Sequence, residues 1–161
     1  MTADAFCRLL FEAPRRNLEA HCAPGDKAGP EYERLTAVAS RPVPACMAAL
    51  EPGASAGRVK LHRGAAEACA RAIEATPWKS SLRTRDLAAY PDCKDLTTGT
   101  AADGASCRTN LECQPASWCA GATFQSDGVC RKRGAAGETC EAPLLFLFDE
   151  PRASCSAGAG R

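Results

Sequence analysis

The stretch GASCRTNLECQPASWCAGATFQSDGVC, residues 104–130, contains four cysteines among its 27 residues, and the predicted fold depends on how they are used. They are Cys107, Cys113, Cys119 and Cys130. Asp-Gly at 103–104 and Ser-Asp-Gly at 126–128 mark tight turns near its two ends. Sulfur at this density can hold a metal, carry out redox chemistry, or cross-link a segment that is too small to fold alone.

The spacing of the cysteines argues against the first two uses. Structural zinc sites are built from close pairs such as Cys-x2-Cys, often with histidines. No two cysteines here are closer than six positions, and His21 and His62 lie outside the stretch. A redox cysteine needs Cys-x-x-Cys or strong positive charge beside it. The one candidate is Cys130, which precedes Arg-Lys-Arg at 131–133, and a solvated turn is the favoured interpretation of that run. We therefore predict no metal and no cofactor, and keep an intracellular zinc-binding protein as an alternative.

Cross-linking is the interpretation that remains for the four cysteines. They would form two bridges, and four cysteines allow three connectivities. We prefer Cys107–Cys119 with Cys113–Cys130, although sequence alone cannot choose among the three.

The whole chain has the composition of a disulfide-stabilised protein. It has 161 residues, a formal net charge of +1, eleven cysteines, and only 6% aromatic residues. A core poor in large side chains gains from cross-links, which restrict the unfolded chain and are usual in exported proteins. Mixed charges without a basic stripe exclude nucleic acid as a partner. The disulfide candidates are Cys7, Cys22, Cys46, Cys69, Cys93, Cys107, Cys113, Cys119, Cys130, Cys140 and Cys155.

The N-terminal half has the periodicity of short helices. The predicted helices cover residues 2–13, 14–22, 29–40, 44–50 and 62–75, with Thr2 or Asp4 as the first N-cap. A single straight helix over 7–22 would hold Cys7 and Cys22 about 22 Å apart, beyond disulfide reach. The chain must therefore reverse near Pro14, or these cysteines pair with other helices. Cys46 and Cys69 make a natural pair between helices.

The predicted fold is a small disulfide-rich protein: an all-α N-terminal region, then a turn-rich, cysteine-knotted module with little, short β-structure. The helical region covers residues 1–92 and the module 93–139. Short strands are expected at 122–125 and 128–132. The strings ADGASC (102–107) and AAGETC (135–140) form a partial repeat. Residues 140–161 would then begin a second, incomplete module.

The cysteine string Gly-x-x-Cys-x5-Cys-x5-Cys-x10-Cys, followed by Gly-x-x-Cys, resembles the N-terminal cysteine-rich module of Dickkopf-type secreted proteins. It is more similar still to cysteine-rich exported proteins and lipoproteins of myxobacteria, in which a cysteine-bearing helical region comes first. Residues that carry the likeness are Gly104, Cys107, Glu112, Cys113, Trp118, Cys119, Cys130, Gly137 and Cys140, with Cys69 in the helical part. The resemblance implies export and disulfides, and supplies no ligand and no catalytic residue.

One motif suggests an enzyme. GASAG at 53–57 matches the Gly-x-Ser-x-Gly elbow, with Ser55 as nucleophile and His62 as a conceivable base. The elbow needs a strand before the serine and a helix after it, whereas here a helical stretch precedes and the extended RVKLH follows. We therefore predict no enzyme and keep a serine hydrolase at Ser55 as the weakest alternative.

The sequence thus predicts a non-enzymatic binding or structural protein at the cell surface or outside the cell, with an unknown protein or cell-envelope partner. The loops 108–110 and 121–127 are the expected binding surfaces. The start MTADAFCRLLF lacks the features of an export signal, so we expect the signal segment to be absent from this chain. No stretch spans a bilayer, since the apolar run PLLFLF (143–148) is too short. An odd cysteine count predicts a free or intermolecular thiol.

Three further side chains have structural expectations. His21 should lie near a helix C-terminus, where positive charge is favourable. Trp118 should pack over a bridge, with ligand stacking as its alternative, and Trp78 should be in the core. The PLLFLF run is expected to be a buried strand or hairpin, with an exposed partner surface as its alternative.

Overall fold

The computed structural model describes residues 1–22, 27, 29–40, 42–77, 87, 90–123 and 125–134. The chain divides into two compact units, each built from two separate segments. The first unit contains residues 1–48 and 61–96, and the second contains residues 49–60 and those from 97 onward. Cys140, Cys155, Trp78, Gly137, the PLLFLF run and the predicted second module lie outside the described residues.

The helical unit begins with two short helices, α1 (Ala3–Phe11) and α2 (Ala13–His21). Thr2 is the N-cap of α1, and its side chain accepts a hydrogen bond from the backbone N–H of Ala5 at 3.2 Å. The helix ends at Glu12 because Pro14 lacks a backbone N–H and favours the first turn of a new helix. The predicted change of helix near Pro14 is therefore confirmed.

The remaining helices are α3 (Pro30–Ser40), α4 (Pro42–Ser55) and α5 (Arg63–Ala75). The sequence predicted that α4 stops at Leu50, before Glu-Pro-Gly. Helix α4 instead continues through Pro52. Backbone bonds still close its end, with Ala56 N–H donating to the carbonyl of Pro52 at 3.2 Å and Arg58 N–H to that of Gly53 at 2.8 Å. A proline this near a helix end removes only one intrahelical bond, which packing can offset.

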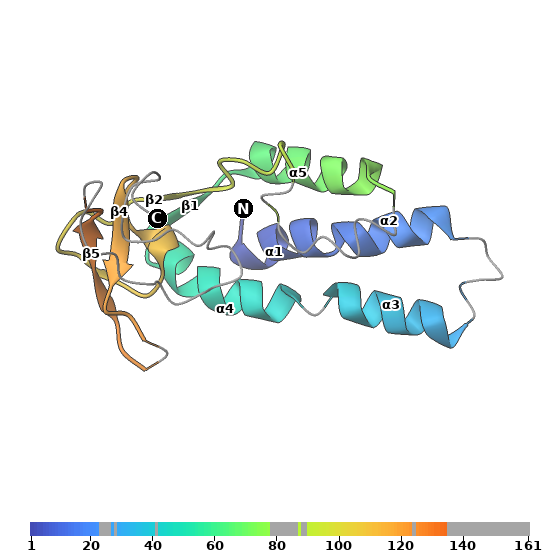
Figure 1. Ribbon diagram of the computed structural model, residues 1–161, viewed down its shortest axis with the longest axis horizontal. Helices are drawn as coiled ribbons and strands as arrows, with labels where there is room; N and C mark the ends of the chain where they lie inside the picture. The colour runs from blue at the N-terminus through green and yellow to red at the C-terminus, as the bar shows by residue number, and fades with distance from the viewer. Residues whose placement is uncertain are drawn as a thin grey trace. The chain divides into compact units, whose positions relative to one another are not determined.

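Helix α5 packs against both α1 and α2 (Figure 1). Its Ala66, Cys69, Ala70 and Ile73 are buried and form one stripe of small and apolar residues, at the helical spacing that predicts a helix over residues 62–75. Asn17 of α2 is also buried, and its amide donates to the carbonyls of Ile73 at 2.9 Å and Thr76 at 2.5 Å. Asn17 thus adds a donor to two carbonyls at the end of α5, of which that of Ile73 also accepts from the N–H of the C-cap residue Thr76 at 3.2 Å.

Two disulfides cross-link the helical unit: Cys7–Cys46 and Cys69–Cys93. The expected Cys46–Cys69 pair is wrong, because Cys46 is bonded to α1 and Cys69 to the segment after α5. Neither does Cys7 pair with Cys22, which has no disulfide partner among the described residues. The bridge to Cys93 also means that this cysteine belongs to the helical unit, whereas the sequence placed it at the start of the module.

Short strands make up the rest of the described fold. Strand β1 (Val59–Leu61) pairs with β2 (Thr97–Gly99). In the second unit, β3 (Ser106–Cys107), β4 (Ser117–Ala120) and β5 (Gly128–Lys132) form an antiparallel sheet in the order β3-β5-β4. A 3₁₀ turn, η3 (Asn110–Glu112), lies between β3 and β4.

The strand predictions are right at one place and wrong at another. The strand expected at 128–132 is confirmed as β5. Of the strand expected at 122–125, residues 122, 123 and 125 are described and form a turn in which the Thr123 hydroxyl accepts from the N–H groups of Gln125 and Ser126. Such side-chain bonds compete with strand pairing. The partners of β5 are instead β3 and β4, neither of which the sequence predicted.

Among the residues that the structure describes, no helix is long and apolar enough to cross a bilayer. The coarse fold class is confirmed: a small disulfide-rich protein with N-terminal helices and a few short strands.

Candidate functional site

The cysteine-rich stretch forms two disulfides, Cys107–Cys119 and Cys113–Cys130. This is the connectivity that the sequence favoured among three. Cys107 comes from β3, Cys119 from β4 and Cys130 from β5, and Cys113 directly follows η3. The sheet brings them together because Cys119 and Cys130 lie directly opposite each other in the β4–β5 register.

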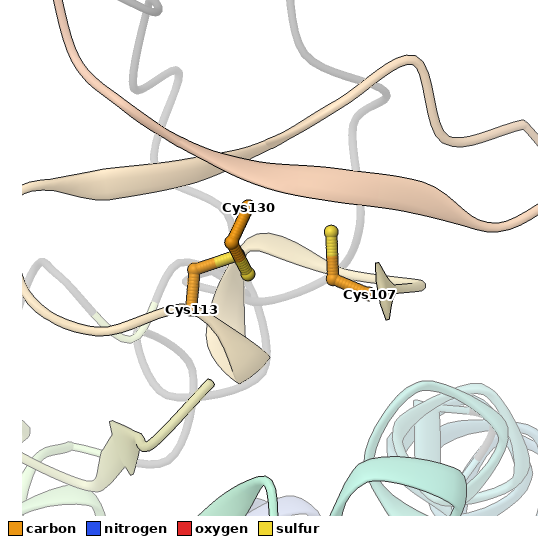
Figure 2. Close-up of side chains that lie close together, drawn as sticks. All are labelled: Cys107, Cys113 and Cys130. Carbon is orange, nitrogen blue, oxygen red and sulfur yellow. A yellow bond between two sulfur atoms is a disulfide. The ribbon is translucent and has the colours of Figure 1, made fainter. Parts of the chain in front are cut away.

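The two bridges lie next to each other in the core of this unit. The sulfur atoms of Cys107, Cys113 and Cys130 are all within 4.8 Å of one another (Figure 2). All four cysteines are buried, and Ala101 completes the buried cluster around them. Because Cys130 is fully buried and bonded to Cys113, it has no thiolate that the following basic residues could activate. Arg131 and Lys132 are exposed on strand β5, not in the solvated turn that we expected.

A buried carboxylate supports the turn between β3 and β4. The side chain of Glu112 is completely buried, and its Oε2 accepts from Nε of Arg58 at 2.5 Å. Its Oε1 accepts from the backbone N–H of Arg108 at 3.3 Å. A buried carboxylate needs such partners, because transfer from water without them is costly. In the sequence, Glu112 stands out only as part of the resemblance, and no local pattern indicates Arg58, 54 positions away, as its partner.

The first expected binding loop, residues 108–110, is mostly structural. Arg108 is exposed, but Thr109 is buried and the side chain of Asn110 accepts from the backbone N–H of Cys119 at 2.8 Å. Asn110 thus ties the turn to β4. The expectation of an exposed three-residue loop is therefore wrong, because Arg108 alone of the three is exposed.

In the second expected loop, residues 121–127, the described residues are exposed apart from the half-buried Ala122, and hydrogen bonds link them to one another. Thr123 N–H donates to the carbonyl of Ser126 at 2.9 Å, and the two hydroxyls lie 2.7 Å apart. At its end, Asp127 pairs with Arg108 at 3.0 Å and accepts from the hydroxyl of Ser106 at 3.3 Å. The loop joins β4 to β5, each of which carries a bridged cysteine. Phe124 lies outside the described residues.

Trp118 is buried in β4, directly opposite Arg131 of β5. Successive residues of a strand point to opposite faces, so Trp118 points away from the bridge of its neighbour Cys119. The expectation that it packs over that bridge does not fit this register. With only 7% of its surface exposed, Trp118 does not offer an open stacking surface in this structure.

Ser55 does not sit in a nucleophile elbow. It is the last residue of helix α4, and its hydroxyl donates to the carboxylate of Glu51 at 2.7 Å. Strand β1 follows it, so helix and strand come in the order opposite to the one that an elbow requires. His62 is the N-cap of α5, and His21 ends α2 with its Nδ1 2.9 Å from the carbonyl of Asn17, at a helix C-terminus as predicted.

No protein-family model, no curated protein and no solved structure matches this chain. The support for the proposed function is therefore the disulfides and the geometry of the described residues.

Proposed function

We propose that the protein is an exported, non-enzymatic binding protein that presents the loop of residues 121–127 to a protein or cell-envelope partner. The observation that carries this proposal is the position of the loop between two bridged strands. Four disulfides among the described residues support an oxidising compartment, because bridges persist outside the cytosol and are rare within it.

The loop has the features of a preorganised binding element. Its Thr123 turn, the Arg108–Asp127 ion pair and the bridges at its base restrict its conformations before any partner is bound. Binding by a rigid loop loses less conformational entropy than binding by a mobile one. Thr123, Gln125, Ser126 and Asp127 are exposed, so the loop offers hydroxyls, an amide and a carboxylate.

We also propose kinship with the myxobacterial type of cysteine-rich exported protein. The support is the spacing of Gly104, Cys107, Cys113, Cys119 and Cys130. That kinship would place the protein at the cell surface or outside the cell, and it makes the disulfide state the first property to measure.

The compartment is tested by intact mass after thiol alkylation, before and after reduction, on protein recovered from an oxidising compartment. We expect Cys7, Cys46, Cys69, Cys93, Cys107, Cys113, Cys119 and Cys130 to be protected until reduction. Free thiols at these eight positions in native protein would contradict the proposal of an exported protein.

The binding role is tested with labelled protein and isolated cell envelopes. Replacing residues 122–126 by a Gly/Ser linker of equal length should abolish saturable retention, while Arg71→Ala on the exposed side of α5 should leave it unchanged. Equal saturable retention of all three proteins would show that the loop is not the binding surface. If isolated envelopes do not retain the unaltered protein, the cell envelope is not its partner.

A further inference from the structure

The two bridges of the second unit place four sulfur atoms in one buried cluster. Three of these atoms, from Cys107, Cys113 and Cys130, lie within 4.8 Å of one another, and the fourth, from Cys119, is bonded to that of Cys107. The four residues are at most 6% exposed. Two bridges could cross-link the same segment without their sulfur atoms meeting, so this convergence is a separate feature of the fold.

Small shifts would convert the cluster into a tetrahedral metal site. Zinc binds four cysteine sulfurs at about 2.3 Å, which places the sulfurs roughly 3.8 Å apart. Because the sulfurs of a disulfide are about 2.0 Å apart, the bonded sulfurs of Cys113–Cys130 and of Cys107–Cys119 would have to separate by about 1.8 Å after reduction. The sulfur of Cys107 already lies within 4.8 Å of those of Cys113 and Cys130, and side-chain rotation can supply shifts of this size. Four sulfur ligands without carboxylate or imidazole favour zinc over magnesium, calcium or manganese.

Backbone contacts would keep the four cysteines near one another after the disulfide bonds are cut. Cys119 lies opposite Cys130, and Cys107 pairs with Gly128 in the same sheet. The N–H of Cys130 also donates to the carbonyl of Ala105 at 2.8 Å. Ala101 and Cys113 form an isolated parallel β-bridge, which positions Cys113, the fourth ligand. The ligands are thus gathered by strand pairing as well as by sulfur–sulfur bonds.

We propose that, when both bridges are reduced, Cys107, Cys113, Cys119 and Cys130 bind a single Zn²⁺. A dithiol or phosphine reductant supplies two electrons to each bridge, and each bridge takes up two protons to give two thiols. Binding as four thiolates then releases four protons to solvent and forms four zinc–sulfur bonds. The module is held by disulfides under oxidising conditions and by the metal under reducing conditions. This inference does not depend on the proposed binding role.

The test uses the full chain, reduced with a phosphine under anaerobic conditions, freed of reductant, and titrated with Co²⁺. We expect one Co²⁺ per chain, with the intense visible bands of a tetrahedral thiolate complex, and displacement by one equivalent of Zn²⁺. Hydrogen exchange gives an independent readout. The amides of Cys130 and Gly104, both bonded in the oxidised structure, should exchange faster on reduction while keeping part of their protection, and should regain full protection when Zn²⁺ is added.

Matched variants separate this site from the other cysteines. Cys7→Ser/Cys46→Ser removes two thiols from the helical unit and should keep full stoichiometry, whereas Cys113→Ser/Cys130→Ser should lose it. Cys119→Ser keeps three ligands and should weaken Co²⁺ binding by more than about tenfold, since even loss of an outer-shell partner costs about 10–100-fold. If Cys113→Ser/Cys130→Ser does not fold, the Co²⁺ affinity of Cys119→Ser is the measurement that tests the proposal.

Three results would overturn the proposal. The first is reduced protein that binds no stoichiometric metal. The second is binding that survives Cys113→Ser/Cys130→Ser or is unaffected by Cys119→Ser. The third is equal binding by the oxidised protein, in which these sulfurs are bonded to one another.

Discussion

Glu112 is completely buried, and its carboxylate accepts a hydrogen bond from Nε of Arg58, 54 positions earlier in the chain. The pair joins residues 49–60 to the cysteine-rich stretch within the second unit. Gly53 lies at the same place, because a Cβ added to it would come within 2.8 Å of Val59 and 2.9 Å of Glu112. The turn that holds Cys113 therefore depends on a segment that the sequence assigns to the helices.

Glu112→Gln should destabilise the second unit by about 2 kcal/mol, because hydrogen bonds to charged groups are worth about 1.5–3 kcal/mol. Chemical denaturation followed by Trp118 fluorescence would measure the change. Glu67→Gln is the matched control, since its pair with Arg63 is exposed and spans 4.0 Å; it should change stability by less than about 0.5 kcal/mol. Equal losses of stability in Glu112→Gln and Glu67→Gln would mean that the buried Glu112–Arg58 pair adds no more stability than an exposed pair.

Gly53→Ala should destabilise the protein by about 1–3 kcal/mol, the usual effect of overpacking. The same substitution at Gly64, also in a helix, meets nothing within 4 Å. Gly64→Ala should stabilise by up to about 1 kcal/mol, because alanine favours helix. Opposite signs in thermal denaturation would support the close packing at Gly53, and stabilisation by both substitutions would contradict it.

Asn17→Ala should cost about 1–3 kcal/mol, because two carbonyls at the end of α5 lose a buried donor. The exposed Arg71→Ala on α5 is the control and should be nearly neutral. Hydrogen exchange of α5 amides measures both changes. A neutral Asn17→Ala would show that water replaces the amide without loss.

Non-reducing digestion and mass spectrometry should yield the linked pairs Cys7–Cys46 and Cys69–Cys93. Removing the second pair as Cys69→Ser/Cys93→Ser should lower stability by about 3–4 kcal/mol, given a loop of more than 15 residues. Recovery of a Cys46–Cys69 peptide would contradict the helical unit described above.

The ion pair of Glu31 with Arg34 in α3 gives a pH dependence of defined sign. The hydrogen bond from Arg34 lowers the pKa of Glu31, although partial desolvation opposes it. Any stability that this pair adds is therefore present above the unfolded-state pKa and is lost as pH falls through the folded-state pKa. Carboxyl NMR titration should show the pKa of Glu31 rising in Arg34→Gln, and an unchanged pKa would exclude the pair in solution.

Local signals predicted much of the helical unit. Thr2 as a capping residue, Pro14 as a helix start and the stripe of Ala66, Cys69 and Ile73 each act within a few residues, so short-range rules apply. Helix α4 runs past its expected end at Leu50 and continues to Ser55, and Gly53 in this extension packs closely on Val59 and Glu112. The contact with Glu112 comes from a residue far away in sequence, which a local rule does not include.

The candidate site was predicted in its covalent framework but not in its supports. The spacing of four close cysteines predicted that they bridge one another, and the observed connectivity was the preferred one of three between which sequence could not choose. The Cys46–Cys69 pair was wrong because widely spaced cysteines leave many partners open. Strand β4 was missed because Ser-Trp-Cys-Ala has no clear alternation of apolar and polar residues. The strand expected at 122–125 was wrong because the Thr123 hydroxyl accepts hydrogen bonds from nearby backbone N–H groups. Such bonds favour a turn, and hydrophobic periodicity does not report them.

The placement of residues 49–60 limits how the chain can be divided. A fragment that begins at Cys93 would contain every cysteine of the sulfur cluster, yet it would lack Arg58 and leave the carboxylate of Glu112 without its cation. A fragment that ends before Cys93 would lose the bridge from Cys69. The cysteine-rich stretch is therefore not a self-contained sequence module. Grafting it onto another protein would require residues 49–60 to be grafted as well, as a separate segment.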